Sequence, residues 1–291
     1  MMSRATSPVA LGDLVALTKP RITFMVMVTT AGGMWLAGHP SAEQVAITLL
    51  GTALVVAGAN TLNMYLEREI DGRMRRTRDR PLPAGRLRPE IALGMGLGLG
   101  LGSVPVLYFG VNPLTGALAA LSLFLYVLVY TPMKQRSPIA LLVGAVPGAM
   151  PPLMGWTATS GTLQTPGLIL FAILWVWQIP HFLAITLFRT QDYAGAGFKV
   201  LAAERGAKAV RWRIVVWLVG LIVVSLLLVP AGVERAPYLV AASLLGAGLL
   251  GWALSGLRGE VSERWARGVF IGSLIYLPLL FLAIALGATP R

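Results

Sequence analysis

Two amides and two carboxylates in the first third of the chain recur at helical spacing. Asn60, Asn63, Glu67 and Asp71 are separated by three, four and four residues. On an α-helix these positions share one face. Carboxylates one turn apart repel each other, and a cation bound between them removes that penalty. Because Mg²⁺ prefers hard oxygen ligands and takes the remainder from water and diphosphate, the spacing predicts a magnesium site for a diphosphate.

An arginine-rich segment follows this stripe and supplies positive charge for a polyanion. Within residues 73–80 we expect Arg76 and Arg80 to contact the diphosphate. A structural alternative exists for each part of the motif. Asp71 and Arg75, four residues apart, would form a surface salt bridge, and the asparagines would form interhelical hydrogen bonds.

The composition shows which kind of element must carry these residues. Apolar residues make up 56% of the 291 positions, and charged residues only 12%. A soluble domain carries roughly 25% charged residues, so a soluble globular protein and a disordered chain are both excluded. The chain contains no cysteine, which excludes disulfides, a thiolate nucleophile and cysteine-bound metals.

Nine uncharged apolar runs are long enough to cross a bilayer as helices. They predict an all-α integral membrane protein with about nine transmembrane helices in a single domain, 1–291, whose first residues, 1–20, form a short cytoplasmic segment. The runs cover residues 22–38, 44–66, 91–110, 113–130, 138–157, 167–188, 214–231, 236–256 and 268–287. In the span at 91–110, the row of Gly94, Gly98 and Gly102 predicts close helix packing.

The basic residues lie almost entirely on one side of the predicted bundle. With the N-terminus inside, 22 of the 24 lysines and arginines fall in inner segments, and only Arg235 and Arg291 fall outside. This distribution predicts a cytoplasmic N-terminus and an external C-terminus. The net charge of +12 is therefore explained by orientation in a lipid bilayer, and we expect no nucleic-acid partner.

Several motifs resemble those of the UbiA superfamily of intramembrane prenyltransferases, from about Leu17 to the last helix. The first acidic motif is represented by residues 63–71 and by the Arg-Thr-x-x-Arg-Pro-Leu-Pro segment at 76–83. The haem-farnesylating branch is indicated by Leu-Thr-Lys-Pro-Arg at 17–21, Tyr-Thr-Pro-x-Lys at 130–134, the Gly-Ala-x-Pro-Pro-Leu-x-Gly run at 148–155, Trp-Gln-x-Pro-His-Phe at 177–182, and Asp-Tyr-x-x-Ala-Gly at 192–197.

The resemblance implies a reaction and its participants. Such an enzyme uses Mg²⁺ to join farnesyl diphosphate to a vinyl group of haem b, adds water and releases pyrophosphate. The implied location is the bacterial cytoplasmic (inner) membrane, with haem A synthase or a terminal oxidase assembly as partners that receive haem O. Asn63, Glu67 and Asp71 match the positions that bind Mg²⁺ and diphosphate, with Asn60 as a further metal ligand.

The second polar loop departs from the wider family pattern. Asp192 has Ala196 where other branches carry a second acid. We therefore expect Asp192 to act as a weaker metal ligand and Lys199 to bind part of the phosphate charge. The structural alternative is a salt bridge between Asp192 and Arg189.

A pair of basic residues precedes each of two helices at the inner side of the membrane, and this similarity suggests a parallel internal repeat. Lys19 and Lys134 are 115 residues apart, and Asp71 and Asp192 are 121 apart. A repeat would bring both acidic loops to one site. Lys134 and Arg136 would then bind diphosphate or haem propionates, although an orienting role alone explains them equally well.

Four aromatic or imidazole side chains are candidates for a haem or prenyl pocket: Tyr130, Trp177, His181 and Phe182. Aromatic faces stabilise allylic cations and exclude water, although aromatics at helix ends are also typical of the membrane interface.

Two other functions are alternatives, namely prenylation of an aromatic acid or quinone precursor, and transport. A transporter typically has ionisable groups near the middle of the membrane. The predicted spans contain none, which argues against transport.

Overall fold

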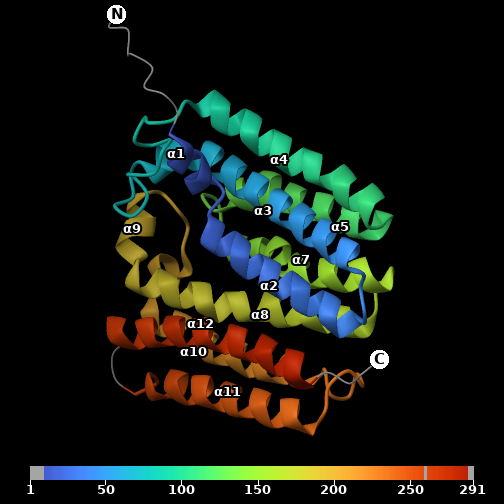
Figure 1. Ribbon diagram of the computed structural model, residues 1–291. Helices are drawn as coiled ribbons and strands as arrows, with labels where there is room; N and C mark the ends of the chain where they lie inside the picture. Colours follow the sequence, from blue (N-terminus) through green and yellow to red (C-terminus); the bar gives the residue numbers. More distant parts are fainter. Residues whose placement is uncertain (1–9, 259–260, 288–291) are drawn as a thin grey trace, which may run out of the picture.

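The computed structural model describes residues 10–258 and 261–287, in which helices joined by turns and loops are the regular elements and no β-strand occurs (Figure 1). Arg4 and Arg291, which entered the charge distribution, lie outside the described residues. The elements are α1 (Leu11–Leu17), α2 (Pro20–Ala37), α3 (Ala42–Asp71), α4 (Pro89–Gly110), α5 (Pro113–Phe124), η1 (Leu125–Tyr130), α6 (Thr131–Met133), α7 (Ala140–Ser160), α8 (Thr165–Phe188), α9 (Thr190–Gly195), α10 (Leu201–Leu226), α11 (Ala236–Ser255) and α12 (Glu263–Gly287).

The predicted membrane fold is confirmed, with a slightly different count of spans. Seven of the described helical segments are long and apolar enough to cross a membrane, and an eighth is added if α1 and α2, bent by 48°, form one span. The remaining predicted span, 138–157, corresponds to α7, which is a continuous helix of 21 residues. Its prolines, glycines and threonines make it less apolar than the others, and most of its inner residues are buried in the bundle.

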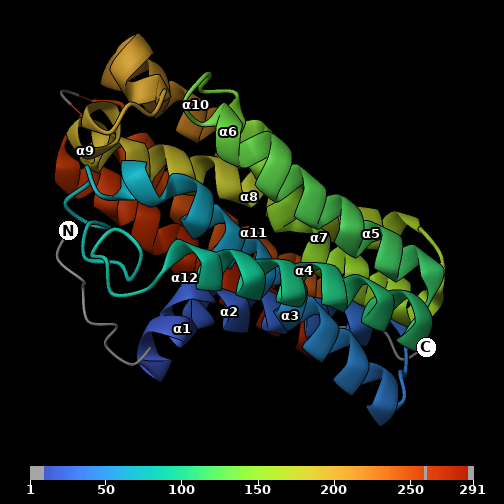
Figure 2. The ribbon, with the colours of Figure 1, turned by 90° about the horizontal axis from the view of Figure 1, so that it is seen from above.

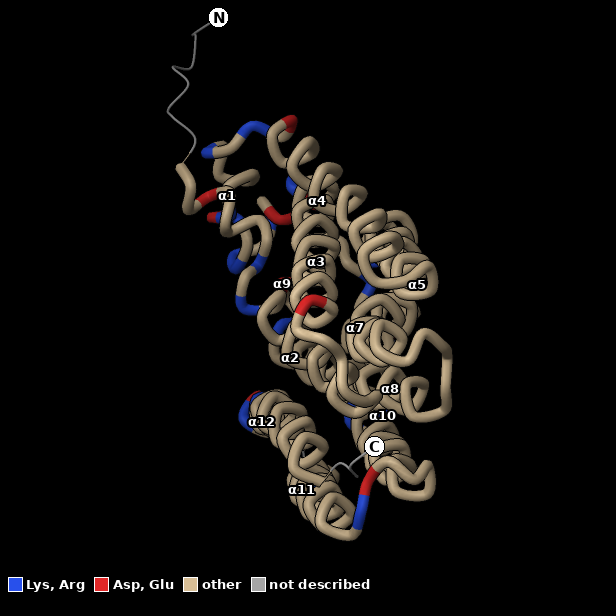
Figure 3. Tube along the Cα trace, turned by 45° about the vertical axis from the view of Figure 1, so that its right-hand side comes forward, with Lys and Arg blue, Asp and Glu red and all other residues tan. Residues whose placement is uncertain are grey.

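The long helices pack as neighbours in two groups that share α7. One apolar core lies among α3, α4, α5 and α7, and the larger core joins α7 and α8 to α10, α11 and α12. Helix α2 packs against α7 as well. Viewed from above, α1, α9 and the loop that follows α3 gather at one end of the bundle (Figure 2). Lysines and arginines concentrate at this end (Figure 3), which we call the basic end.

Local sequence signals account for the helix boundaries. Ser41 caps α3 by accepting the Gln44 N–H at 3.1 Å, and Asn112 caps α5 by accepting the Thr115 N–H at 2.8 Å. Prolines occupy the first turn of five long helices, where the missing N–H is tolerated: α2, α4, α5, α8 and α11.

Helix α10 begins earlier and ends earlier than the apolar run at 214–231. It starts at Leu201 and ends at Leu226, with a break at Gly206, whose φ of 76° is available to glycine at little cost. The early part carries basic residues, which a search for uncharged runs excludes although the residues are helical.

The predicted packing role of one glycine row in α4 is wrong. A methyl group added at Gly94, Gly98 or Gly102 would meet nothing within 4 Å. The alternate row contacts α3 instead, since a methyl group on Gly58 would lie 2.3 Å from the Gly100 nitrogen. Both rows have the same spacing, so the sequence identifies a glycine-rich helix without identifying its packed face.

Candidate active site

The four polar side chains of the predicted stripe lie on α3 close to the basic end. Asn60, Asn63, Glu67 and Asp71 are all buried, with at most 5% of each residue exposed. Buried carboxylates are costly unless a charge or hydrogen bonds compensate them. The neighbours of the stripe therefore determine what the site binds.

Three cations from three separate segments face the stripe. They come from the residue before α2, from the loop after α3 and from the segment after α6. The pairs are Lys19 Nζ donating to Asn63 Oδ1 at 3.4 Å, Lys134 Nζ lying 2.8 Å from Glu67 Oε1, and Arg80 Nη1 donating to Asp71 Oδ2 at 2.7 Å. The site thus brings concentrated positive charge to buried acids.

The structural alternative for Asp71, a salt bridge to Arg75, is not found among the described residues, and Asp71 pairs with Arg80 instead. Asp71 also accepts, through its backbone oxygen, a hydrogen bond from the Thr77 hydroxyl at 2.8 Å. The chain after α3 turns back on itself, so that Arg80 reaches the carboxylate nine residues earlier.

The two long loops at the basic end meet, as the repeat predicted. The backbone N–H of Arg75 donates to Asp192 Oδ1 at 3.1 Å, and no ion pair to Arg189 is found among the described residues. Met74 packs with Ala196 and Phe198 in a small apolar cluster between the loops. Asp192 is therefore beside the stripe without joining its carboxylates.

A π-helical turn, η1, places a hydroxyl against the stripe. Thr131 Oγ1 accepts a hydrogen bond from Asn63 Nδ2 at 3.1 Å and donates to the Tyr126 backbone oxygen at 2.8 Å. Because the amide nitrogen of Asn63 is hydrogen-bonded to Thr131, Asn63 Oδ1 is left for a cation.

The same π-helical turn ends at Tyr130, and the ammonium of Lys134 lies 4.5 Å from the centre of the Tyr130 ring. Such turns are frequent at functional sites.

Lys19 reaches the stripe from a left-handed backbone conformation, with φ 48° and ψ 64°. This conformation is uncommon for a residue with a side chain, and such strain often occurs at functional sites. Burial, together with the charges of Arg80 and Lys134, lowers the pKa of Lys19 to about 7. Lys19 and Thr131 were not predicted as site residues. The 115-residue spacing of the two lysines was the available signal for Lys19.

The donor set of the stripe fits a cation that shares its ligands with a substrate. Glu67 Oε1 and Asp71 Oδ1 are buried without a hydrogen bond, and the Lys134 ammonium near Glu67 is not aligned to donate one. No three His, Cys, Asp or Glu side chains in the described chain are close enough to hold a metal alone. Mg²⁺ would suit this site, because it accepts amide, water and diphosphate oxygens beside one or two carboxylates.

Three predicted phosphate-binding residues have exposed side chains, and the structure does not bring them onto the stripe. These are Arg76, Arg136 and Lys199. Lys199 is nevertheless adjacent, because its backbone N–H donates to the Lys134 oxygen at 3.0 Å.

The predicted aromatic pocket divides into separate parts. His181 stacks on Trp177 with ring centres 4.8 Å apart, and His181 Nδ1 lies 2.8 Å from the Ser273 hydroxyl on α12. The neighbouring Phe182 is 37% exposed. Tyr130 packs against Gly144 of α7 instead, beside Lys134.

Comparisons with known proteins give a consistent assignment. Residues 26–286 match the family described as the UbiA prenyltransferase family. A relative from Anaeromyxobacter sp. (strain Fw109-5), named "Protoheme IX farnesyltransferase", is 53% identical over 95% of this chain and 93% of its own length. A relative with the same name from Myxococcus xanthus (strain DK1622) is 49% identical over 100% of both chains.

Solved structures share the fold at lower sequence identity. A digeranylgeranylglyceryl phosphate synthase superimposes with a TM-score of 0.81 at 18% identity, covering 95% of this chain and 98% of its own. A UbiA homologue from Archaeoglobus fulgidus, bound to GPP and Mg²⁺, gives a TM-score of 0.66 at 15% identity, covering 94% of this chain and 99% of its own.

Proposed function

The chain belongs to the UbiA prenyltransferase family, and from this membership we propose that it transfers the farnesyl group of farnesyl diphosphate to a vinyl group of haem b. Farnesyl diphosphate, haem b and water give haem O and pyrophosphate. The observation that supports this chemistry is the buried stripe on α3, where Glu67 and Asp71 each have one carboxylate oxygen without a hydrogen bond and lie beside Lys134 and Arg80. The choice of substrates rests on the named relatives.

We assign Glu67, Asp71, Asn63 and Asn60 as the groups that hold Mg²⁺, with Asp192 as a weaker contributor. When bound, Mg²⁺ would stabilise the negative charge that develops on the departing pyrophosphate. Each carboxylate would then exchange part of its contact with a protein cation for the metal.

The protein's own cations complete the stabilisation of the leaving group. Arg80 and Lys134 already lie within 2.8 Å of the stripe carboxylates, so both are placed to contact a diphosphate bound there. Lys19 adds a third donor, and an anion beside it would favour its charged form. Preorganised positive charge lowers the barrier because it need not reorganise during the reaction.

Two features protect the allylic cation that forms when the carbon–oxygen bond breaks. The stripe is buried, which limits stray water. The ring of Tyr130 beside Lys134 offers an aromatic face close to the diphosphate, where a cation is favoured.

We further propose that the protein lies in the bacterial cytoplasmic membrane with its basic end and N-terminus inside. The concentration of lysine and arginine at one end supports this orientation. Its product would pass to haem A synthase or to a terminal oxidase assembly.

The direct test uses the purified full-length protein in detergent with haem b, farnesyl diphosphate and Mg²⁺. Mass spectrometry should detect haem O, and chelation of Mg²⁺ should abolish its formation. Prenylation of 4-hydroxybenzoate with no product from haem b would contradict the assigned acceptor.

A further inference from the structure

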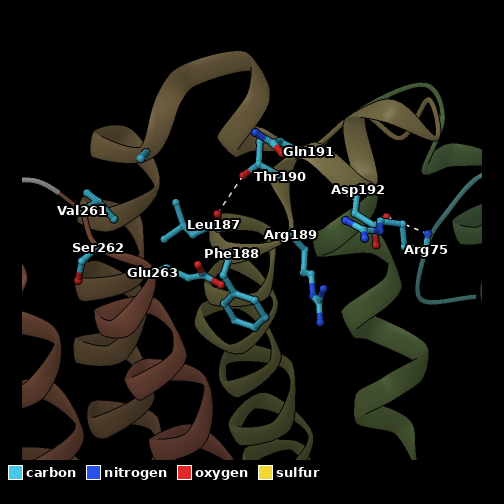
Figure 4. A pocket seen from close by; sticks show the side chains of 11 residues that line it. Arg75, Leu187, Phe188, Arg189, Thr190, Gln191, Asp192, Val261, Ser262 and Glu263 are labelled. Atoms are coloured by element: carbon cyan, nitrogen blue, oxygen red, sulfur yellow. Dashed lines mark hydrogen bonds between the residues drawn. The ribbon is translucent and has the colours of Figure 1, made fainter.

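A cavity of about 650 Å³ opens at the basic end between the end of α8, the helix α9 and the start of α12 (Figure 4). Its size falls within the range of about 300–1,000 Å³ that is typical of ligand sites. Its wall combines apolar side chains, Leu187 and Phe188, with the basic side chains of Arg75 and Arg189. Arg189 had no predicted role in binding, and Arg75 was predicted only as part of the arginine-rich segment 73–80.

The two arginines belong to the cations of the basic end whose side chains have no acidic partner among the described residues. Arg75 and Arg189 form no ion pair with any residue that the structure describes, whereas Arg80 is paired with Asp71 and Arg86 with Asp13. In Figure 4 Arg189 extends from the end of α8 beside Phe188, and Arg75 lies next to Asp192.

The acids in the cavity wall are already engaged. Asp192 accepts the Arg75 backbone N–H, and Glu263 accepts a hydrogen bond from Arg267 Nε at 3.0 Å. The guanidinium groups of Arg75 and Arg189 are therefore available to an anionic ligand, for which carboxylates are well suited.

Behind the Phe188 wall of the cavity, packed aromatic rings continue into the bundle between α8 and α12. The Phe188 ring centre is 5.7 Å from that of Phe270, which is 4.9 Å from that of His181. His181 in turn stacks on Trp177. Large flat apolar ligands favour such surfaces. A ligand that matches this cavity wall is planar and apolar, with carboxylates at one edge.

The cavity is also next to the stripe. Arg75 follows Asp71 by four residues, and its backbone is hydrogen-bonded to Asp192 in the cavity wall. A ligand in the cavity would therefore lie beside a diphosphate held by Asp71, as the acceptor of a prenyl group must.

We propose that this cavity is the acceptor site, in which Arg75 and Arg189 bind the two propionates of haem b and Phe188, supported from behind by Phe270, contacts its ring. The assignment rests on the proposed function. Haem b carries its propionates on one edge and its vinyl groups on the other. Propionates held by the arginines therefore place the vinyl edge on the opposite side of the ring from Arg75 and Arg189.

The test compares two ligands in the full-length protein in detergent. Haem b and its dimethyl ester, in which both propionates are masked, are titrated by Soret absorbance into wild type, Arg75→Gln, Arg189→Gln and the control Arg88→Gln. Arg88 is exposed at the same end and pairs with Glu90. Arg75→Gln retains the backbone N–H that binds Asp192.

We expect each cavity variant to weaken haem b binding about tenfold, and the control to leave it unchanged. Binding of the dimethyl ester should change less than twofold in all variants, because the ester lacks the charges that the arginines recognise. Unchanged haem b affinity, or an equal loss for haem b and ester, would overturn the site. Haem O formation by wild type, measured in parallel, tests the proposed function separately.

Discussion

At the residue scale, the stripe on α3 owes its character to the cations that neutralise it. Lys134 and Arg80 contact Glu67 and Asp71 directly, which stabilises two acids that would otherwise be buried without compensation. The same cations are suited to a diphosphate, so folding and substrate binding use one set of charges.

Asp192 is expected to contribute less to metal binding than the stripe. Asp192→Asn retains an oxygen that can accept the Arg75 N–H, so the contact between the loops should persist. We predict that turnover falls about tenfold, a change of about 1.4 kcal/mol, and that the Mg²⁺ concentration for half-maximal rate rises.

Haem O formation over a Mg²⁺ titration measures both effects, with Asp79→Asn as the control because Asp79 is exposed in the neighbouring loop. Mg²⁺ dependence identical to that of wild type would make Asp192 a purely structural carboxylate.

Several site residues could be predicted from the sequence because they follow one another at helical spacing. The stripe is of this kind. Lys19 and Thr131 depend on the approach of segments 44 and 68 residues away from Asn63, which local spacing does not encode. Arg76 was predicted from its charge and from the Arg-Thr-x-x-Arg-Pro motif, and neither reveals which side of a loop faces the site.

At the element scale, the hydropathy pattern predicted every long helix because uncharged runs of sufficient length must be helical in lipid. It missed helical residues that carry charged side chains, as at the start of α10. It also failed to identify the packed face of α4, because two glycine rows with equal spacing alternate along that helix.

The contact between α3 and α4 gives a prediction with a matched control. Gly58→Ala places a methyl group 2.3 Å from backbone of Gly100, and the helices must separate. Overpacking of this kind typically costs about 1–3 kcal/mol, so the melting temperature in detergent should fall by several degrees. Gly98→Ala, which meets nothing within 4 Å, should leave it unchanged. Equal melting temperatures for the two variants would show that the contact is looser than described.

The turn between α10 and α11 contains a buried acid with a predictable pH effect. Burial raises the pKa of Glu234 from its ordinary value of 4.5 to about 8. The folded protein therefore binds this proton more tightly than the unfolded chain does. The resulting stability is fully present below about pH 4.5 and is lost as the pH rises through about 8.

Glu234→Gln, which is neutral at every pH, should therefore melt at a higher temperature than wild type at pH 9 and at the same temperature at pH 4.5. Glu43→Gln, at an exposed position, should show no such dependence. A difference between Glu234→Gln and wild type that is constant with pH would contradict the raised pKa.

At the scale of the whole molecule, the concentration of basic residues at one end predicts the orientation in the membrane. Reporter fusions near Arg80 and near Gly161 should report opposite sides, with Arg80 in the cytoplasm. Three helical segments separate the two positions, and α7 is the least apolar of them. The same side for both fusions would mean that α7 does not cross the membrane.

The central claim is that Glu67 and Asp71 hold the diphosphate through Mg²⁺, and haem O formation by Asp71→Asn over a range of Mg²⁺ concentrations tests it most directly. Loss of leaving-group stabilisation should lower turnover at least a hundredfold, about 2.8 kcal/mol, and raise the Mg²⁺ requirement. Rates are expressed per folded protein, because the variant also leaves Arg80 without its partner. Near-normal turnover with an unchanged Mg²⁺ dependence would reduce Asp71 to a structural partner of Arg80 and contradict the account.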